Sequence, residues 1–161
     1  MFERELGMFR FLRNYAHNLM TDIRDDDLCV RPHPQSTHAA WLLGHLAVVY
    51  DRIGDHIGGI RILEERWHEL FAPGTTVQDD PAIYPSRIEL IEAYDAGHAQ
   101  LERTVPDIPR HKIDAPNPHQ RLAEYLPATG DLIAFVLTAH EATHIGQLSA
   151  WRQALGRERL F

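Results

Sequence analysis

The 161-residue sequence has a single cysteine, Cys29, so the chain cannot form an internal disulfide. This favours a reducing compartment. No apolar run reaches the roughly eighteen residues that a membrane-spanning helix requires, and residues 1–15 lack the apolar segment of a signal peptide. We therefore expect a cytoplasmic protein that does not enter a membrane.

Basic residues are also scarce: 16 Lys and Arg against 23 Asp and Glu give a net charge of −7. No basic stripe offsets this balance, which argues against a protein that binds the phosphate backbone of nucleic acids. We expect a small-molecule substrate instead. The residue type in excess is histidine, with eleven copies.

Strand signals are nearly absent, because no segment alternates apolar and polar residues between turns. The prolines fall in three stretches, 32–34, 73–85 and 106–127, and leave four segments with helical periodicity. These segments are 2–23, 36–58, 86–105 and 129–156. The pattern predicts an all-α four-helix bundle, with residues 1–161 forming a single domain.

Local signals mark the ends of these helices. Ser36 or Thr37 is a good N-cap for the second helix, and Ser86 with Glu89 fits a capping box at the third. Gly156 is a natural end for the fourth. The two connections after the second helix exceed about twenty residues each, so we expect short helical turns near 61–71 and 120–126. Such lengths also permit crossover connections.

Two histidines of the fourth predicted helix, His140 and His144, lie four residues apart and so share one face. Burying two imidazoles without a shared partner is costly, which favours a metal site. The segment matches H-E-x-x-H, the zinc-protease motif, but no third ligand with protease spacing follows it. A third ligand must therefore come from upstream.

His45 and His98 are the upstream histidines that fall in apolar stripes, and periodicity favours His45 only slightly. Gly44 and Gly146 would let backbones approach closely around a buried ion. A lone histidine on an apolar face is more often a hydrogen-bonded core residue, which is the alternative for His98. The other histidines that we assign to polar faces or loops, and expect to be solvated, are His17, His33, His68, His111 and His119.

Two motifs, Trp-Leu-Leu-Gly-His-Leu-Ala at 41–47 and His-Glu-Ala-Thr-His-Ile-Gly-Gln-Leu at 140–148, resemble those of the DinB-like (YfiT-like) superfamily of metal-dependent enzymes. The resemblance implies a four-helix bundle with a divalent ion, zinc or nickel, held by His45, His140 and His144. Members with assigned activities are mostly transferases or isomerases that use bacillithiol, mycothiol or a glutathione-like thiol. The resemblance thus implies a thiol cosubstrate here.

Three histidine ligands leave a coordination position open, as in catalytic sites. A thiol bound there is deprotonated, and it must come from outside, because three aspartates just before Cys29 disfavour its thiolate. We expect a metal-dependent S-transferase or isomerase. The alternatives are a metal-dependent hydrolase that activates water and a non-catalytic metal-binding sensor or interaction module.

Three further residues are candidates around this site. Glu141 would act as a base or orient a ligand; the alternative is a surface glutamate paired with an arginine such as Arg152. Gln147 and Trp151 would contact the substrate or thiol. The alternatives are that Gln147 bridges helices and that Trp151 belongs to the core.

Assembly is the last expectation. Phe2, Phe9 and Phe11 place aromatic rings on more than one side of the first helix. We therefore expect a homodimer, the commonest oligomer.

Overall fold

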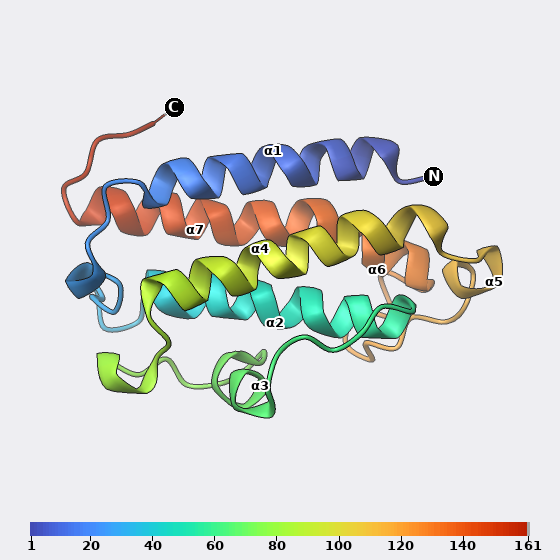
Figure 1. Ribbon diagram of the computed structural model, residues 1–161, viewed down its shortest axis with the longest axis horizontal. Coiled ribbons are helices and arrows are strands. Elements are labelled where there is room, and N and C mark those ends of the chain that lie inside the picture. Colours follow the sequence, from blue (N-terminus) through green and yellow to red (C-terminus); the bar gives the residue numbers. More distant parts are fainter. Residues whose placement is uncertain (161) are drawn as a thin grey trace.

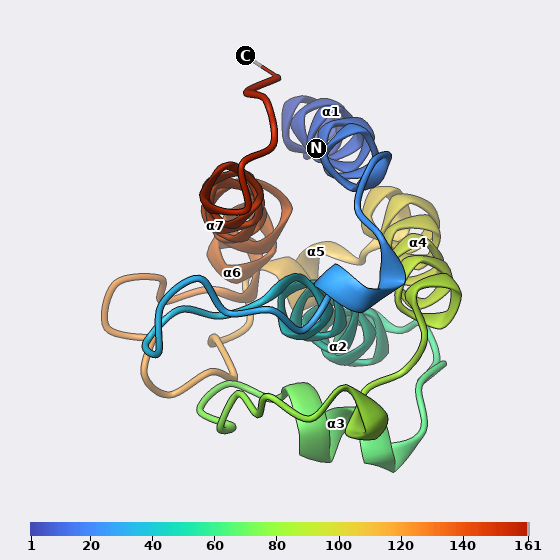
Figure 2. The same cartoon turned by 90° about the vertical axis from the view of Figure 1, so that its left-hand side faces the viewer.

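The computed structural model describes residues 1–160, and four long helical stretches form a bundle (Figures 1 and 2). They are α1 (Glu3–Met20), α2 (Ala39–Ile57), α4 (Arg87–Thr104) and a continuous helix made of α6 (Thr129–Phe135), the π-helical segment η4 (Val136–His140) and α7 (Glu141–Ala154). Within residues 1–160 there is no strand, only an isolated bridge between Pro116 and Ala128. The predicted all-α bundle is confirmed.

The helices do not simply alternate in direction. Figure 1 shows α1 and α7 running one way and α2 and α4 running the other. Because α2 and α4 are parallel, the chain between them must return along the bundle, and this crossover carries α3 (Glu65–Phe71) and the short η2 (Pro81–Ile83). The crossover that the connection length permits is therefore present.

Short elements complete the chain. They are η1 (Asp25–Asp27), η3 (Val105–Asp107) and α5 (Arg110–Ile113). The helical turn expected near 61–71 is α3. Residues 120–126 instead form hydrogen-bonded turns, such as Leu126 N–H to the Leu122 carbonyl at 2.8 Å, without a helix.

The helix caps follow the sequence at α4 but not at α2. Ser86 and Glu89 form the predicted capping box. The N-cap of α2 is His38, and the prediction of Ser36 or Thr37 is wrong. The Nδ1 of this buried ring accepts the Trp41 N–H at 3.2 Å. The unprotonated ring nitrogen of His38 thus caps the helix, a role that a serine hydroxyl usually fills.

Helices α2 and α4 pack closely because small residues face larger side chains. A Cβ on Gly97 would lie 2.8 Å from Cβ of Tyr50, and one on Gly54 would lie 2.3 Å from the Gln100 amide nitrogen. This contact holds the helix that carries His45 at a fixed distance from the one that carries His98.

The π-helical segment η4 changes which residues of the last helix face the core. The sequence predicts a stripe that continues through His140, His144 and Gln147. The structure instead buries Glu141, Ile145 and Leu148. A π turn contains an extra residue and so rotates the following helix face. His140 and His144 consequently lie half-buried at the edge of the core.

Candidate metal centre

Three histidines from two sides of the bundle meet at one point. His45 comes from α2, His140 ends η4 and His144 lies one turn into α7. Their candidate ligand nitrogens all lie within 4.8 Å of one another. The structure therefore brings together the three residues that the family resemblance implies.

His45 is held by contacts on two sides. Its Nδ1–H donates to the carbonyl oxygen of Phe71 at 2.9 Å, and the Trp41 ring stacks on it with centroids 4.7 Å apart. With Nδ1 used, Nε2 is the nitrogen that carries the lone pair. Gly44 makes this possible, because a Cβ there would lie 2.4 Å from the Phe71 ring. Gly146, by contrast, faces open space, so the expected close backbone approach there is wrong.

The other two rings differ in how they are held. The Nδ1–H of His144 donates to the Gln147 side-chain oxygen at 2.8 Å, whereas Nδ1 of His140 is buried without a partner among the described residues. Such an orphaned ring nitrogen is unusual in a protein interior unless an additional ligand is bound. The hydrogen bond with Gln147 orients the His144 ring.

Burial lowers the pKa of all three imidazoles, because the charged form loses hydration. The pKa falls to about 4 for His45 and about 3 for His140, and it is also lowered for His144. All three rings are therefore neutral at pH 7 and have lone pairs to donate. Three neutral imidazoles form a donor set that suits zinc or nickel, so the residues present fit a divalent ion.

Glu141 lies in the core and is not part of this cluster. Its Oε1 accepts a hydrogen bond from the Tyr94 hydroxyl and another from His98 Nε2, each at 2.7 Å. Burial raises the pKa of this carboxyl to about 8 and holds the pKa of His98 well below its usual value. The alternative of a surface glutamate paired with Arg152 is wrong, because Arg152 binds Asp22 and Glu141 is fully buried.

His98 belongs to the same buried group. Its ring stacks on Phe9 with centroids 3.6 Å apart. With Nε2 engaged by Glu141, His98 is a core residue hydrogen-bonded to a neighbour.

Two further residues are buried: for Trp151 this is the core alternative that the sequence left open, and for His68 it corrects the expected solvated position. Trp151 is buried, its Nε1–H donates to the Val30 carbonyl at 2.7 Å, and it does not line the pocket beside the histidines. His68, expected to be solvated, is 3% exposed and binds Asp51 at 2.9 Å. Its position on the short α3, packed against α2, could not be read from periodicity.

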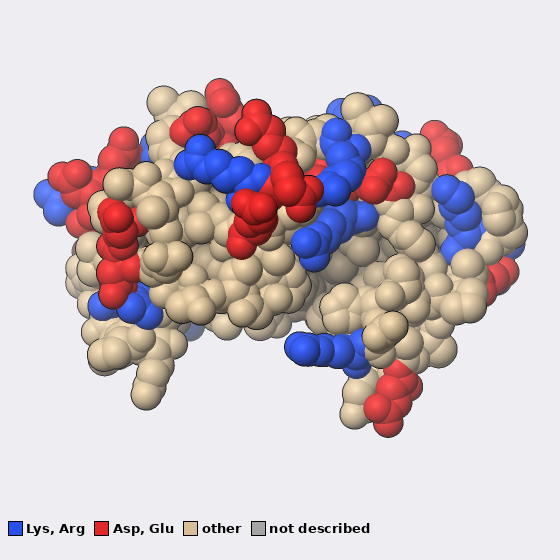
Figure 3. All heavy atoms as spheres, turned by 90° about the horizontal axis from the view of Figure 1, so that it is seen from below, with Lys and Arg blue, Asp and Glu red and all other residues tan. Residues whose placement is uncertain are grey.

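A pocket of about 540 Å³ opens beside the cluster. It lies between α2, the α6–η4 helix, Pro73 and the loop before α6. His45 and His140 form one part of its wall, and the rest is lined by Val49, Arg52, Ile53, His56, Pro73, Pro118, His119, Arg121, Leu122, Leu132, Phe135 and Val136. Figure 3 shows the underside of the molecule hollowed near its centre, with basic side chains on both sides of the hollow.

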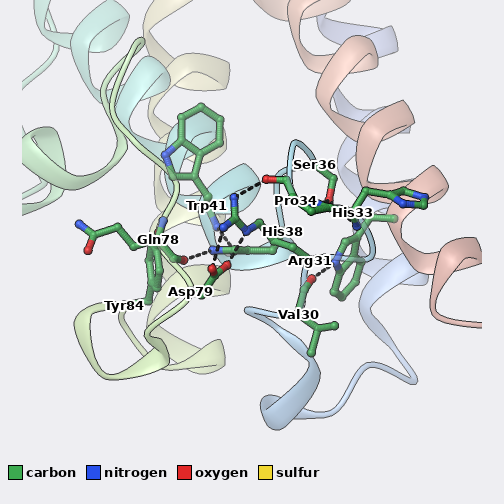
Figure 4. A network of polar contacts seen from close by, with 11 residues as sticks. Val30, Arg31, His33, Pro34, Ser36, His38, Trp41, Gln78, Asp79 and Tyr84 are labelled. Atoms are coloured by element: carbon green, nitrogen blue, oxygen red, sulfur yellow. Dashed lines mark hydrogen bonds and ion pairs between the residues drawn. The ribbon is translucent and has the colours of Figure 1, made fainter.

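A polar network fixes the loop that supports His45 (Figure 4). Arg31 forms an ion pair with Asp79 from across the N-terminal end of α2, and His38 Nε2 donates to the Gln78 carbonyl at 3.0 Å. Thr75, in the same loop, accepts the Trp41 indole N–H at 3.1 Å. These contacts hold the segment after Phe71 against α2, and so keep the Phe71 carbonyl in place.

The fold and the cluster together define an all-α bundle protein with a candidate three-histidine metal centre. The sequence matches the DinB superfamily over residues 8–148, and the chain belongs to that superfamily. The solved structure of a conserved protein from Enterococcus faecalis has the same fold: its TM-score is 0.73 at 14% identity, covering 98% of each chain. No curated protein matches the sequence. No helix within residues 1–160 is both long and apolar enough to cross a membrane.

Proposed function

We propose that this protein is a divalent-metal-dependent enzyme that uses a small thiol as cosubstrate, in an S-transferase or isomerase reaction. The observation that carries the proposal is the neutral three-histidine cluster in the wall of a pocket of about 540 Å³. A buried structural site would need four closed ligands. Here the protein supplies three, beside a space large enough for a small molecule.

The chain's own residues would hold and orient the ion. His45, His140 and His144 would be the ligands, with the Phe71 carbonyl and Gln147 fixing two of the rings. Zinc or nickel held by neutral ligands would supply a positive charge that favours a bound thiolate. Orienting partners of this kind typically matter about 10–100-fold for metal affinity.

The thiol has to come from outside the protein. Burial raises the pKa of Cys29, which reduces its thiolate fraction near neutral pH. Cys29 also does not line the pocket. A reducing cytoplasm, which the single cysteine favours, contains low-molecular-weight thiols such as glutathione.

The position of Glu141 bears on the alternative of hydrolysis. In zinc proteases the H-E-x-x-H glutamate acts as general base on metal-bound water. Here that carboxyl is bound to Tyr94 and His98 in the core, and no acidic residue lines the pocket. This arrangement favours thiol transfer over protease-type hydrolysis.

The test is a conjugation assay with zinc- or nickel-loaded protein. Glutathione, bacillithiol or mycothiol is mixed with monochlorobimane, and the rate is compared with that of His140→Ala and of the control variant His111→Ala, because His111 does not line the pocket. We expect acceleration by the wild type and by His111→Ala only. Ester or amide hydrolysis without any thiol effect would establish the hydrolase instead. Metal binding that stabilises the fold without either activity would indicate a non-catalytic sensor.

A further inference from the structure

The charged groups in the pocket beside the histidines are all of one sign. Arg52 of α2 and Arg121 of the loop before α6 both line it, and they are joined by His56 and His119. No aspartate or glutamate does so. In a chain with a net charge of −7, this local absence of acidic groups is a property of the pocket and not of the composition.

Arg52 is positioned by a buried chain of polar groups. Its Nε–H donates to His68 Nδ1 at 3.2 Å, and the other ring nitrogen of His68 donates to the Asp51 carboxylate at 2.9 Å. Asp51 is fully buried and also accepts the Ile62 N–H at 2.6 Å. The bond to Asp51 fixes the tautomer in which Nδ1 can accept from Arg52. The terminal nitrogens of Arg52 make no hydrogen bond to another described residue.

Arg121 lines the same pocket from a different segment. It lies in the hydrogen-bonded turns of residues 119–126, and no acidic side chain within residues 1–160 forms an ion pair with it. Eight arginines within residues 1–160 form an ion pair with an aspartate or glutamate, as Arg152 does with Asp22, and Arg52 and Arg121 are not among them. Two guanidinium groups in one pocket without carboxylate partners are thus available to a ligand.

The rest of the pocket wall is apolar. Val49 and Ile53 line it from α2, and Leu132, Phe135 and Val136 line it from the opposite helix. An apolar wall with a few placed polar groups is the usual composition of a small-molecule site.

We propose that the pocket binds an organic oxyanion, a carboxylate or phosphate carried on an apolar body. The oxyanion binds Arg52 and Arg121, and the apolar body packs between α2 and α6. Guanidinium groups recognise both oxyanions through paired N–H donors. This proposal rests on the proposed function in one respect: it takes the oxyanion to be part of the substrate or thiol that reacts at the histidine cluster.

Binding of a matched probe series by calorimetry tests this. The probes share a phenylpropyl body and end in a carboxylate (4-phenylbutyrate), a phosphate (3-phenylpropyl phosphate), a hydroxyl (3-phenylpropanol) or an ammonium (3-phenylpropylamine). We expect at least one of the two oxyanions to bind about tenfold or more tightly than the alcohol, because charge-assisted bonds to guanidinium are strong, and the ammonium to bind most weakly. The carboxylate and phosphate arms decide which oxyanion fits.

The arginine variants locate the oxyanion. Arg52→Met and Arg121→Met should each reduce the preference over the alcohol, and Arg4→Met, on the exposed face of α1, should leave it unchanged. Arg121 lies in an exposed turn, so its variant is informative even if the loss of Arg52 disturbs α3. Equal binding of oxyanions and alcohol, or a preference that survives both pocket substitutions, would overturn the proposal.

Metal-free protein separates this proposal from the proposed function. Oxyanion binding by the arginines should persist after zinc is removed with a chelator. A preference that appears only with zinc would show that the anion binds the ion, and the arginine site would then be rejected. Failure of the thiol assay would contradict the proposed reaction but leave oxyanion binding by the arginines intact.

Discussion

Gly44→Ala places a methyl group where the structure has no space for one. The added Cβ would lie 2.4 Å from Cε1 of Phe71 and 2.5 Å from two further ring carbons. Ordinary contact begins near 3.4 Å, so the ring has to retreat by about 1 Å. Phe71 is fully buried and packs against Trp67 and Tyr84, so its ring has no solvent to turn into.

The expected cost follows from two opposing effects. Overpacking of a buried site typically costs about 1–3 kcal/mol, and replacing a helical glycine by alanine returns up to about 1 kcal/mol. We expect the free energy of unfolding to fall by roughly 1–2 kcal/mol. Displacing Phe71 also displaces the carbonyl that orients His45, so zinc affinity should fall by about tenfold.

Chemical denaturation of the metal-free protein measures the first effect, and competition with a chromophoric chelator measures the second. Gly146→Ala is the matched control, because it lies in α7 two residues after His144 and nothing lies within 4 Å of the place that its Cβ would occupy. It should gain up to about 1 kcal/mol and keep its zinc affinity. If Gly44→Ala and Gly146→Ala show the same stability and the same zinc affinity, the packing of Phe71 against Gly44 does not position His45, and the reasoning is refuted.

Four other outcomes follow from the structure. Glu141→Ala should lower the free energy of unfolding by about 2–4 kcal/mol in denaturation, because the buried Tyr94 hydroxyl loses its acceptor; an unchanged stability would contradict a core role. Burial lowers the pKa of His38, so its contribution to stability is present above pH ~6.5 and is lost as the pH falls toward the lowered value, by up to about 1.4 kcal/mol per pH unit. His38→Asn keeps a capping side chain for the Trp41 N–H and should make the measured slope between pH 7 and 5 shallower, although the other buried histidines still contribute to it. Because the pKa of Cys29 is raised, its alkylation by iodoacetamide at pH 7 should be slower than that of free cysteine, and Cys29→Ser should retain thiol-dependent activity. Light scattering should report about twice 18.5 kDa if the expected homodimer forms, and a mass of 18.5 kDa would reject it.

The aromatic residues that motivate a dimer do not all remain available for one. Phe2 and Phe9 are buried within the bundle, and Phe11 is 52% exposed beside the exposed Met8. The positions of these residues along α1 could not distinguish a core contact from a contact with a partner. That distinction depends on which other helices pack on α1.

Local sequence signals determined the helices and two of the three histidines of the candidate site. Helical periodicity, proline stretches and the Ser86–Glu89 capping box act over a few residues, so they specify α1, α2, α4 and the last helix without reference to the rest of the fold. The four-residue spacing of His140 and His144 places them on neighbouring turns in the same local way.

Periodicity left open which upstream histidine joins that pair; the family resemblance implied His45, and the tertiary structure supplies the physical reason. His45 and His98 both occupy apolar stripes, and periodicity cannot separate them. Packing separates them, because His98 stacks on Phe9 and binds Glu141, whereas His45 is turned by the Phe71 carbonyl toward the last helix.

The π turn and the pocket also depended on the tertiary structure. A π turn is unfavourable by itself and persists only where the surrounding packing supports it, so the sequence did not show that Glu141 enters the core while His140 and His144 stay at its edge. The pocket walls come from α2 and from the loop before α6, separated by more than fifty residues of chain. Arg52 and Arg121 line one pocket only because a crossover and a long loop bring these segments together. No local sequence pattern predicts this contact between segments.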